Sequence, residues 1–326
     1  MCVMEKIKKY IKISLQLSVS VVAFYYLYNK FDIDLISTIK ATNLWFLLLA
    51  CAIRIFISPL IYINRWKLFL EKLGVYESFG TLLKISMMSA FIGVILPSSQ
   101  GADLVRMVMI EKRHPSISLN NKMASSTILV ERVIGFFIFA LLGLFFSLVC
   151  SYPEKDKVVF CILTINIFIW LTMFILTNRF CYKYTKILFE KIKIPSRILL
   201  FIDKMYNTLV EFPYKEVLLS SFALILLLQI VTILILYCVF LSFGVNLPLY
   251  QHFAFYPIIS ILSIIPISIG GLGLREGFFV SFYSLLGVNP SIAISVSLIN
   301  YLIEIVMFAL FGGVVYALKS LNIIKV

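Results

Sequence analysis

The sequence predicts an all-α membrane protein with about six full transmembrane helices and two re-entrant helical hairpins. Of the 326 residues, 61% are hydrophobic and only 14% are charged, and the mean hydropathy is +1.02. A chain of this composition cannot cover the surface of an ordinary soluble domain, because such a surface needs more charged side chains. Long apolar runs and an uneven distribution of basic residues support the same fold class. Lipid is therefore the predicted solvent for most of the chain.

Six apolar runs are long enough to cross the hydrocarbon core, which takes about 20 residues of helix. The first run follows Lys6, Lys8 and Lys9 and has no small-residue cleavage site, so it predicts a retained helix and not a signal peptide. The six predicted spans cover residues 11–28, 44–63, 128–149, 158–176, 217–243 and 292–318.

Two further apolar stretches are short or interrupted. Residues 82–96 end at Pro97, and residues 253–286 are broken in their middle by a proline and three glycines. Broken backbone at membrane depth is tolerated where it lines protein or a watery cavity, so both stretches predict re-entrant hairpins. The alternative is an ordinary bundle with proline kinks, in which 253–286 forms one tilted span or two short ones. The residues that break the second stretch are Pro266, Gly270, Gly271 and Gly273.

The basic residues predict the orientation, because cytoplasmic loops hold most of the Lys and Arg. If neither hairpin crosses, the N-terminus, residues 64–127, residues 177–216 and the C-terminus share one side and hold 22 basic residues. The other side holds five, and the remaining two, Arg54 and Arg132, fall in predicted helices. We therefore predict a multi-pass protein of the cytoplasmic (inner) cell membrane, with both termini in the cytoplasm.

Internal symmetry relates the two hairpins. A shift of 169 residues aligns a proline, a serine, a glycine and an arginine of one stretch with the same residue types in the other. We predict one membrane domain, 1–326, that contains two repeats at about 44–149 and 217–318. Three crossings separate the two repeat starts, so the copies should be inverted, as in many transporters, and should enter from opposite faces. The aligned pairs are Pro97 with Pro266, Ser99 with Ser268, Gly101 with Gly270, Arg106 with Arg275, and, further on, Gly143 with Gly312.

Three ordered motifs resemble those of a known family. The run LPSSQGADLVR at 96–106 resembles its P-S-S-x-G-G-D-x-x-R element, and PISIGGLGLREG at 266–277 resembles its P-x-S-x-G-G-x-G-x-R-E element. Between them, Glu131, Arg132 and Gly135 resemble its L-E-R-x-x-G element. The chain is thus similar to flippase-like integral membrane proteins related to the transmembrane region of lysylphosphatidylglycerol synthase. Ala102 departs from the glycine that many relatives have.

The resemblance implies a flippase-like domain that moves modified phospholipids, with relatives in glycolipid and polyprenyl-linked pathways. A soluble aminoacyltransferase domain is not found in this sequence, so lysyltransferase activity is not expected. Movement of an amphipathic phospho- or polyprenyl-linked lipid is the favoured function. A membrane enzyme or accessory subunit in lipid-linked glycan or aminoacyl-lipid metabolism is the alternative, and a scaffold is a third class.

Two arginines are the predicted anchors for a lipid phosphate, because a planar, permanently charged guanidinium suits that group. Arg106 and Arg275 follow the two proline and glycine breaks and would lie one near each leaflet. The alternative for both is a topology-determining or snorkelling role, and Asp103 could pair with Arg106 at i, i+3. The neighbours expected to share the site, or to neutralise these arginines, are Asp103, Glu131, Arg132 and Glu276.

Two ionisable residues fall near the centres of predicted spans. Arg54 and Glu304 would each cost about 2.5–3.5 kcal/mol at the helix centre, so each needs a partner or water. A shared polar cavity and a buried structural ion pair are equally good interpretations. Asn300 lies one turn before Glu304, and the 169-residue shift aligns Asn300 with Glu131.

The sequence indicates no cofactor and no metal. The six cysteines lack CxxC spacing, and HExxH and GxSxG are absent. The basic charge has no nucleic-acid-binding pattern around it, which points to the membrane surface. Predicted partners are membrane lipids with phosphate head groups and lipid-modifying enzymes, and a homo-oligomer is compatible with the sequence.

Overall fold

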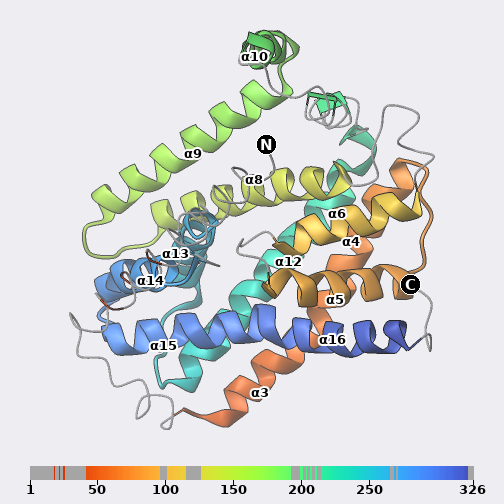
Figure 1. Ribbon diagram of the computed structural model, residues 1–326. Helices are drawn as coiled ribbons and strands as arrows, with labels where there is room; N and C mark the ends of the chain where they lie inside the picture. Colours follow the sequence, from red (N-terminus) through yellow and green to blue (C-terminus); the bar gives the residue numbers. More distant parts are fainter. Residues whose placement is uncertain are drawn as a thin grey trace.

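The computed structural model describes residues 42–95, 101–114, 126–191, 199–200, 214–264, 268 and 271–321, together with residues 18, 22, 25, 203, 206, 207 and 210. Helices are the only regular elements among these residues (Figure 1). The predicted all-α class is therefore confirmed for this part of the chain. The predicted span 11–28 lies outside the described residues, apart from single positions.

The first long helix consists of α3 (Leu44–Ala52), the π turn η1 (Ile53–Ile57) and α4 (Ser58–Lys72). The side chain of Asn43 caps its start by accepting a hydrogen bond from the N–H of Trp45. Pro59 has no N–H to donate inside the helix. The N–H of Ser58 bonds to the carbonyl of Ile53, five residues back, which is π geometry.

The first hairpin is built from α5 (Phe79–Ile95) and α6 (Gly101–Arg113), which pack side by side. Pro97 and Ser99 fall in the connection, outside the described residues. A Cβ on Gly93 would lie 2.3 Å from the N atom of Ala102, so only glycine lets the two helices approach this closely. The apolar stretch predicted at 82–96 corresponds to α5 only. Hydropathy does not reveal the second helix of the hairpin, α6, because it carries several charged residues and is not continuously apolar.

The second apolar stretch forms α13 (Leu249–Leu262) and α14 (Leu274–Tyr283), followed by the 3-10 turn η3 (Ser284–Leu286). A single continuous helix over 253–286 is excluded, because α13 ends at Leu262 and α14 begins at Leu274, and the re-entrant arrangement of this stretch stays a prediction. Gly271 and Gly273 in this break have φ values of 78° and 83°, a conformation that favours glycine. Pro266 and Gly270 lie outside the described residues.

The remaining helices complete the bundle. They are α8 (Ser126–Val149), α9 (Lys155–Thr177), α10 (Arg179–Lys191), α12 (Tyr214–Ser242), α15 (Pro290–Tyr301), the π turn η4 (Leu302–Val306) and α16 (Met307–Ser320). Helices α15, η4 and α16 run on as one long helix, which crosses the width of Figure 1.

Four helices in the described part of the chain are long and apolar enough to cross a membrane: Leu44–Lys72, Thr127–Val149, Leu219–Ser242 and Pro290–Ser320. They correspond to four of the six predicted spans, and a fifth, 158–176, is helical as α9. Large apolar side chains such as Trp45, Phe56 and Phe160 are exposed on the outside of the bundle. This exposure suits lipid as the solvent, and the molecule is a multi-pass membrane protein.

Helices that the 169-residue shift relates to each other make equivalent packing contacts. The first hairpin packs along α16 through α5, and the second packs along α8 through α13. Aligned glycines lie in these contacts: a Cβ on Gly312 would lie 1.8 Å from the carbonyl oxygen of Met87, and one on Gly143 would lie 3.2 Å from Pro257. Adding 169 to the bounds of α5 gives 248–264, close to the observed Leu249–Leu262 of α13. The inverted orientation of the two halves stays a prediction.

Candidate functional site

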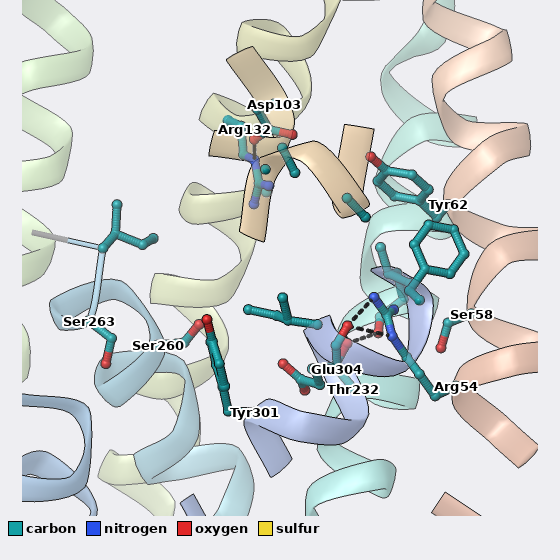
Figure 2. A pocket seen from close by; sticks show the side chains of 18 of the residues that line it. Arg54, Ser58, Tyr62, Asp103, Arg132, Thr232, Ser260, Ser263, Tyr301 and Glu304 are labelled. Atoms are coloured by element: carbon teal, nitrogen blue, oxygen red, sulfur yellow. Dashed lines mark hydrogen bonds and ion pairs between the residues drawn. The ribbon is translucent and has the colours of Figure 1, made fainter. Parts of the chain in front are cut away.

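A cavity of about 520 Å³ lies between the two hairpins and the long helices. Its walls come from almost every helix of the bundle, including both π turns (Figure 2). The lining is amphipathic: it combines five arginines and three carboxylates with apolar side chains. The apolar part includes Phe136, Phe139, Leu228, Ile259 and Phe279.

Eight of the nine residues predicted to bind substrate line this cavity, although they come from six different elements. The ninth, Glu276, is completely buried and contacts the cavity residue Arg275. The eight are Arg54, Asp103, Arg106, Glu131, Arg132, Arg275, Asn300 and Glu304. Tertiary structure thus gathers the polar residues that the sequence singled out, while their role in binding stays a prediction.

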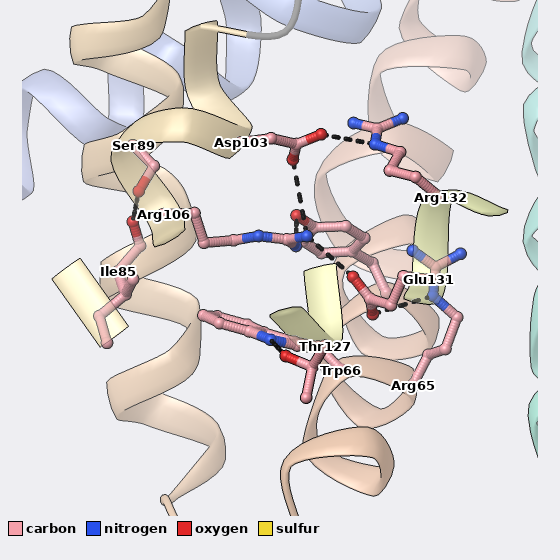
Figure 3. Close-up of polar contacts among 10 residues, drawn as sticks. Arg65, Trp66, Ile85, Ser89, Asp103, Arg106, Thr127, Glu131 and Arg132 are labelled. Carbon is pink, nitrogen blue, oxygen red and sulfur yellow. Dashed lines mark hydrogen bonds and ion pairs between the residues drawn. The ribbon is translucent and has the colours of Figure 1, made fainter. Parts of the chain in front are cut away.

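One end of the cavity holds an ion-pair network that is centred on Arg106 (Figure 3). An Nη of Arg106 lies 2.8 Å from a carboxylate oxygen of Glu131 and 3.5 Å from one of Asp103. The second Glu131 oxygen accepts a hydrogen bond from Arg65, at 3.2 Å. Asp103 in turn pairs with Arg132, at 2.5 Å. The network therefore joins α4, α6 and α8.

Arg106 is deeply buried, with only 1% of its surface exposed. Its guanidinium lies between the rings of Tyr62 and Trp66, at 4.9 and 4.6 Å from their centroids, and it donates to the Tyr62 hydroxyl. Both of its terminal nitrogens are therefore engaged, while its Nε has no hydrogen-bond partner among the described residues. Arg106 thus ties α4, α6 and α8 together, and its role as an anchor for a lipid phosphate stays a prediction.

Sequence reasoning missed Arg65, Tyr62 and Trp66 as parts of this network. The distribution of basic residues predicts a cytoplasmic Arg65, but this side chain is buried in α4. Removing Arg65 and Arg106 from the 22 basic residues of the cytoplasmic side leaves 20 basic residues against five, so the predicted orientation is unchanged. The available signal was the spacing of Tyr62, Trp66 and Phe69, which places aromatic side chains on the same helix face as Arg65.

Arg275 lies in a second network, at the start of α14. Its Nη2 pairs with Glu276 at 2.5 Å, and its Nε donates to the Ser297 hydroxyl at 3.0 Å. Glu276 also accepts the N–H of Gly273 at 2.6 Å, which caps the helix. The ring of Tyr301 lies 4.2 Å from the guanidinium carbon of Arg275. Glu276 and Arg275 thus form an ion pair at the start of α14.

Arg54 and Glu304 face each other from the two π turns, η1 and η4. The guanidinium of Arg54 donates two hydrogen bonds, at 2.9 and 2.6 Å, to the main-chain carbonyl of Glu304. The Glu304 carboxylate instead accepts a hydrogen bond from the Tyr256 hydroxyl, at 3.0 Å. Asn300 donates to the same hydroxyl at 3.3 Å. The interpretation as a buried ion pair is thus wrong in detail, because Arg54 holds the backbone and not the carboxylate.

The described residues include no cluster of three or more His, Cys, Asp or Glu side chains that could hold a metal ion. The chemistry of the cavity is instead that of guanidinium, carboxylate, hydroxyl and amide groups beside apolar walls. Such a lining can hold an anionic group and exclude bulk water from it.

Residues 13–312 match the family model described as the lysylphosphatidylglycerol synthase TM region. A UPF0104 membrane protein of Methanocaldococcus jannaschii is 26% identical over 303 residues, which cover 85% of this chain and 86% of that protein. A UPF0104 membrane protein of Pyrococcus horikoshii is 25% identical over 285 residues, which cover 79% of this chain and 82% of that protein. A third, from Methanothermobacter thermautotrophicus, is 22% identical over 303 residues, or 86% of this chain and 85% of its own length.

Proposed function

This chain belongs to the lysylphosphatidylglycerol synthase TM region family, and we propose that it moves an amphipathic, phosphate-bearing lipid across the membrane. The observation that carries the proposal is the cavity within the helical bundle, where five arginines outnumber three carboxylates beside apolar walls. A lipid phosphate needs cationic donors, and its glycerol and chain regions need apolar surface. One lining of this kind serves both parts of a phospholipid or a polyprenyl phosphate.

Three arginines are the proposed contacts for the head group. Arg132 pairs with Asp103 through Nε, which leaves its two terminal nitrogens for a ligand, and 43% of its side chain is exposed. Arg54 contacts only a main-chain carbonyl oxygen among the described polar groups. Arg275 also lines the cavity, beside the Tyr301 ring; its Nε and Nη2 are paired with Glu276 and Ser297, and its Nη1 donates no hydrogen bond to the described residues. A phosphate could pass between these guanidinium groups while its charge stays partnered.

The two hairpins supply a mechanism for alternating access. If the two repeats are inverted, α5–α6 would enter from the cytoplasm and α13–α14 from outside, and their tips would meet at the cavity. Opening one hairpin at a time would expose the same arginines first to one leaflet and then to the other. This arrangement is part of the proposal, and the matched packing of α5 on α16 and α13 on α8 supports it.

A reconstituted lipid-movement assay tests the function. Purified protein is placed in proteoliposomes that carry a fluorescent phosphatidylglycerol, and the fraction of label that moves between leaflets is followed with an impermeant quencher. We expect movement above that of protein-free vesicles. Replacing Arg275 by alanine should slow it at least tenfold, and Arg275→Lys should recover only part, because lysine lacks the planar fork of donors.

Lys157 offers a matched control. It is an exposed basic residue at the start of α9, away from the cavity lining, and Lys157→Ala should behave as the wild type. Equal rates in wild-type protein and protein-free vesicles would reject the transport function for this lipid. Chemical modification of the labelled lipid without movement would favour the alternative of a membrane enzyme.

A further inference from the structure

We propose that Glu304 is a proton-binding site, and that one proton enters it when an anionic head group binds in the cavity. This inference rests on the proposed function and adds a coupling ion to it. The proton would come from water in the cavity and attach to the carboxylate oxygen that does not contact Tyr256. Lipid anion and proton would then leave together, as a neutral pair.

The first argument is the unequal pairing of the carboxylates around the cavity. Glu131, Asp103 and Glu276 each contact at least one arginine side chain. By contrast, no cationic nitrogen of the described residues lies within ion-pair distance of the Glu304 carboxylate, although Arg54 is bound to the carbonyl of the same residue. A carboxylate inside an apolar bundle that lacks a cation partner is more costly to charge than one that is paired. Glu304 is thus the acid of this cavity that is best suited to changing its charge.

The second argument is an unused acceptor next to it. Asn300 is 4% exposed, and its Oδ1 has no hydrogen-bond donor among the described residues. It lies one turn before Glu304 on the same long helix, so both side chains point to the same side. A buried acceptor of this kind needs a donor, and an ionised carboxylate cannot supply one, whereas a protonated carboxyl can. The local hydrogen bonding therefore suits both charge states of Glu304.

The groups that face Glu304 from the packed elements are few. They are Arg54 from η1, Tyr256 from α13 and Arg275 from α14 as titratable or charged groups, and Asn300 from α15 as a neutral one. The lining residues of α5 and α12 near them are uncharged, and α16 contributes Phe308, whose ring lies 5.5 Å from the Arg54 guanidinium carbon. Glu276 lies behind Arg275, with which it forms an ion pair.

Repulsion between neighbouring anions gives a reason for proton and anion to bind together. Arg54 is bonded to the main chain of Glu304, so a monoanionic phosphodiester held by Arg54 would lie close to the Glu304 carboxylate. Two like charges repel strongly in a low-dielectric site, which makes the ionised form of Glu304 more costly and favours its protonated form.

Calorimetry in lipid nanodiscs of phosphatidylcholine tests the coupling. Dioctanoyl phosphatidylglycerol is titrated into the protein in two buffers that differ in ionisation enthalpy, and the difference in heat gives the number of protons taken up. In the pH range where Glu304 titrates, we expect uptake of about one proton per bound lipid. As the pH rises through and above this range, the affinity for the lipid should fall, approaching a loss of about tenfold for each pH unit. Inorganic phosphate in place of the lipid should bind much more weakly, because it cannot use the apolar walls.

Glu304→Gln should still bind the lipid, but with no proton uptake and no pH dependence. Glu71→Gln serves as the control, because Glu71 is a half-exposed carboxylate that pairs with Lys67 outside the cavity, and this variant should match the wild type. If Glu304→Gln cannot be purified, Tyr256→Phe gives a second test. It removes the hydrogen bond to the ionised carboxylate and should move the pH dependence to higher pH.

The outcomes separate the two proposals. Lipid binding without proton uptake would overturn the coupling and leave lipid movement standing. Proton uptake that persists in Glu304→Gln would assign the proton to another group and would overturn the role of Glu304. No binding of the lipid at any pH would overturn both proposals, and inorganic phosphate binding as tightly as the lipid would make this a site for the free anion.

Discussion

At the scale of single residues, the arginines of the cavity divide by their partners. Arg106 contacts two carboxylates and two aromatic rings, whereas Arg132 contacts one carboxylate and remains partly exposed. A guanidinium whose terminal nitrogens are both engaged by other helices holds those helices in register, and one with an unpaired terminal nitrogen is available to a ligand. Residues of the same type therefore have different consequences when they are removed.

Arg106→Ala should destabilise the protein by about 3–5 kcal/mol. The substitution removes one partner of a buried network, so that the charged Glu131 and Asp103 both lose their ion pair with Arg106. Arg132→Ala, which acts on the more exposed member, should cost about 1 kcal/mol or less and should impair lipid movement instead. Thermal unfolding in detergent measures the first effect, and the vesicle assay measures the second. An Arg106→Ala protein as stable as the wild type would contradict this division.

The loop between α4 and α5 carries a pH-sensitive contact outside the membrane helices. Glu77 accepts hydrogen bonds from Arg113 at 2.7 Å and from His114 at 3.0 Å. Burial by itself would raise the pKa of Glu77, but the hydrogen bonds and charges of Arg113 and His114 outweigh it and hold the pKa below its ordinary value of 4.5. The stability that this contact contributes is therefore complete above about pH 4.5 and is lost as the pH falls through the lowered pKa.

Thermal unfolding of wild-type protein and of Glu77→Gln, followed between pH 7 and pH 3, checks this linkage. The wild type should be the more stable of the two at pH 7, and the difference should shrink below pH 4.5. A difference that grows as the pH falls would mean that the neutral form of Glu77 makes the better contact.

At the scale of elements, the two π turns are the feature that shapes the cavity. Both interrupt long helices at the level of the cavity, and they bring Arg54 and Glu304 into contact across 250 residues of sequence. Pro59 accounts for the first turn, because it cannot donate to the helix. No comparable residue explains the second. Local backbone irregularity thus lies where the proposed ligand binds, as π turns often do.

Glycine contacts between helices allow a graded test of packing. Gly312→Ala should destabilise the protein by about 1–3 kcal/mol, because the new Cβ would overlap the Met87 carbonyl and force α16 away from α5. Gly143→Ala should cost less, since its Cβ would meet Pro257 at 3.2 Å, where a small shift suffices. Gly80→Ala in α5 has open space around it and should be neutral or slightly stabilising. Unfolding in detergent ranks the three variants, and equal stabilities would contradict these contacts.

At the scale of the whole molecule, the proposal depends on two hairpins that enter from opposite faces. The equivalent serines of the sequence motif are unsuitable probes, because Ser99 lies outside the described residues and Ser268 is only 3% exposed. Lys112 at the end of α6 and Ser281 near the end of α14 are better, since both are exposed and 169 residues separate them.

In a cysteine-free background, Lys112→Cys should react with an impermeant thiol reagent from the cytoplasmic side only, and Ser281→Cys from the outer side only. Labelling intact cells and inside-out vesicles distinguishes the two faces. Reaction of both cysteines from one face would mean that the repeats are parallel or that the hairpins span the membrane. Either result would remove the structural basis of alternating access.

The sequence by itself determined the membrane class, the extent of most long helices and the breaks in the two hairpins. These properties are local: hydropathy over about 20 residues measures the cost of transfer into lipid, and proline and glycine act on their own backbone. It also singled out the polar residues of the cavity, because charge in an apolar run is conspicuous. It could not decide how those residues pair.

Only the tertiary structure assigned the partners. Arg65 and Glu131 are 66 residues apart, and Arg54 and Glu304 are 250 apart, so their contacts depend on which helix faces pack together. The same packing buries Arg106 among aromatic rings and leaves the Glu304 carboxylate without an ion pair to the described residues. Whether an ionisable side chain positions a helix or holds a ligand depends on its neighbours in space, because burial and pairing set the cost of its charge.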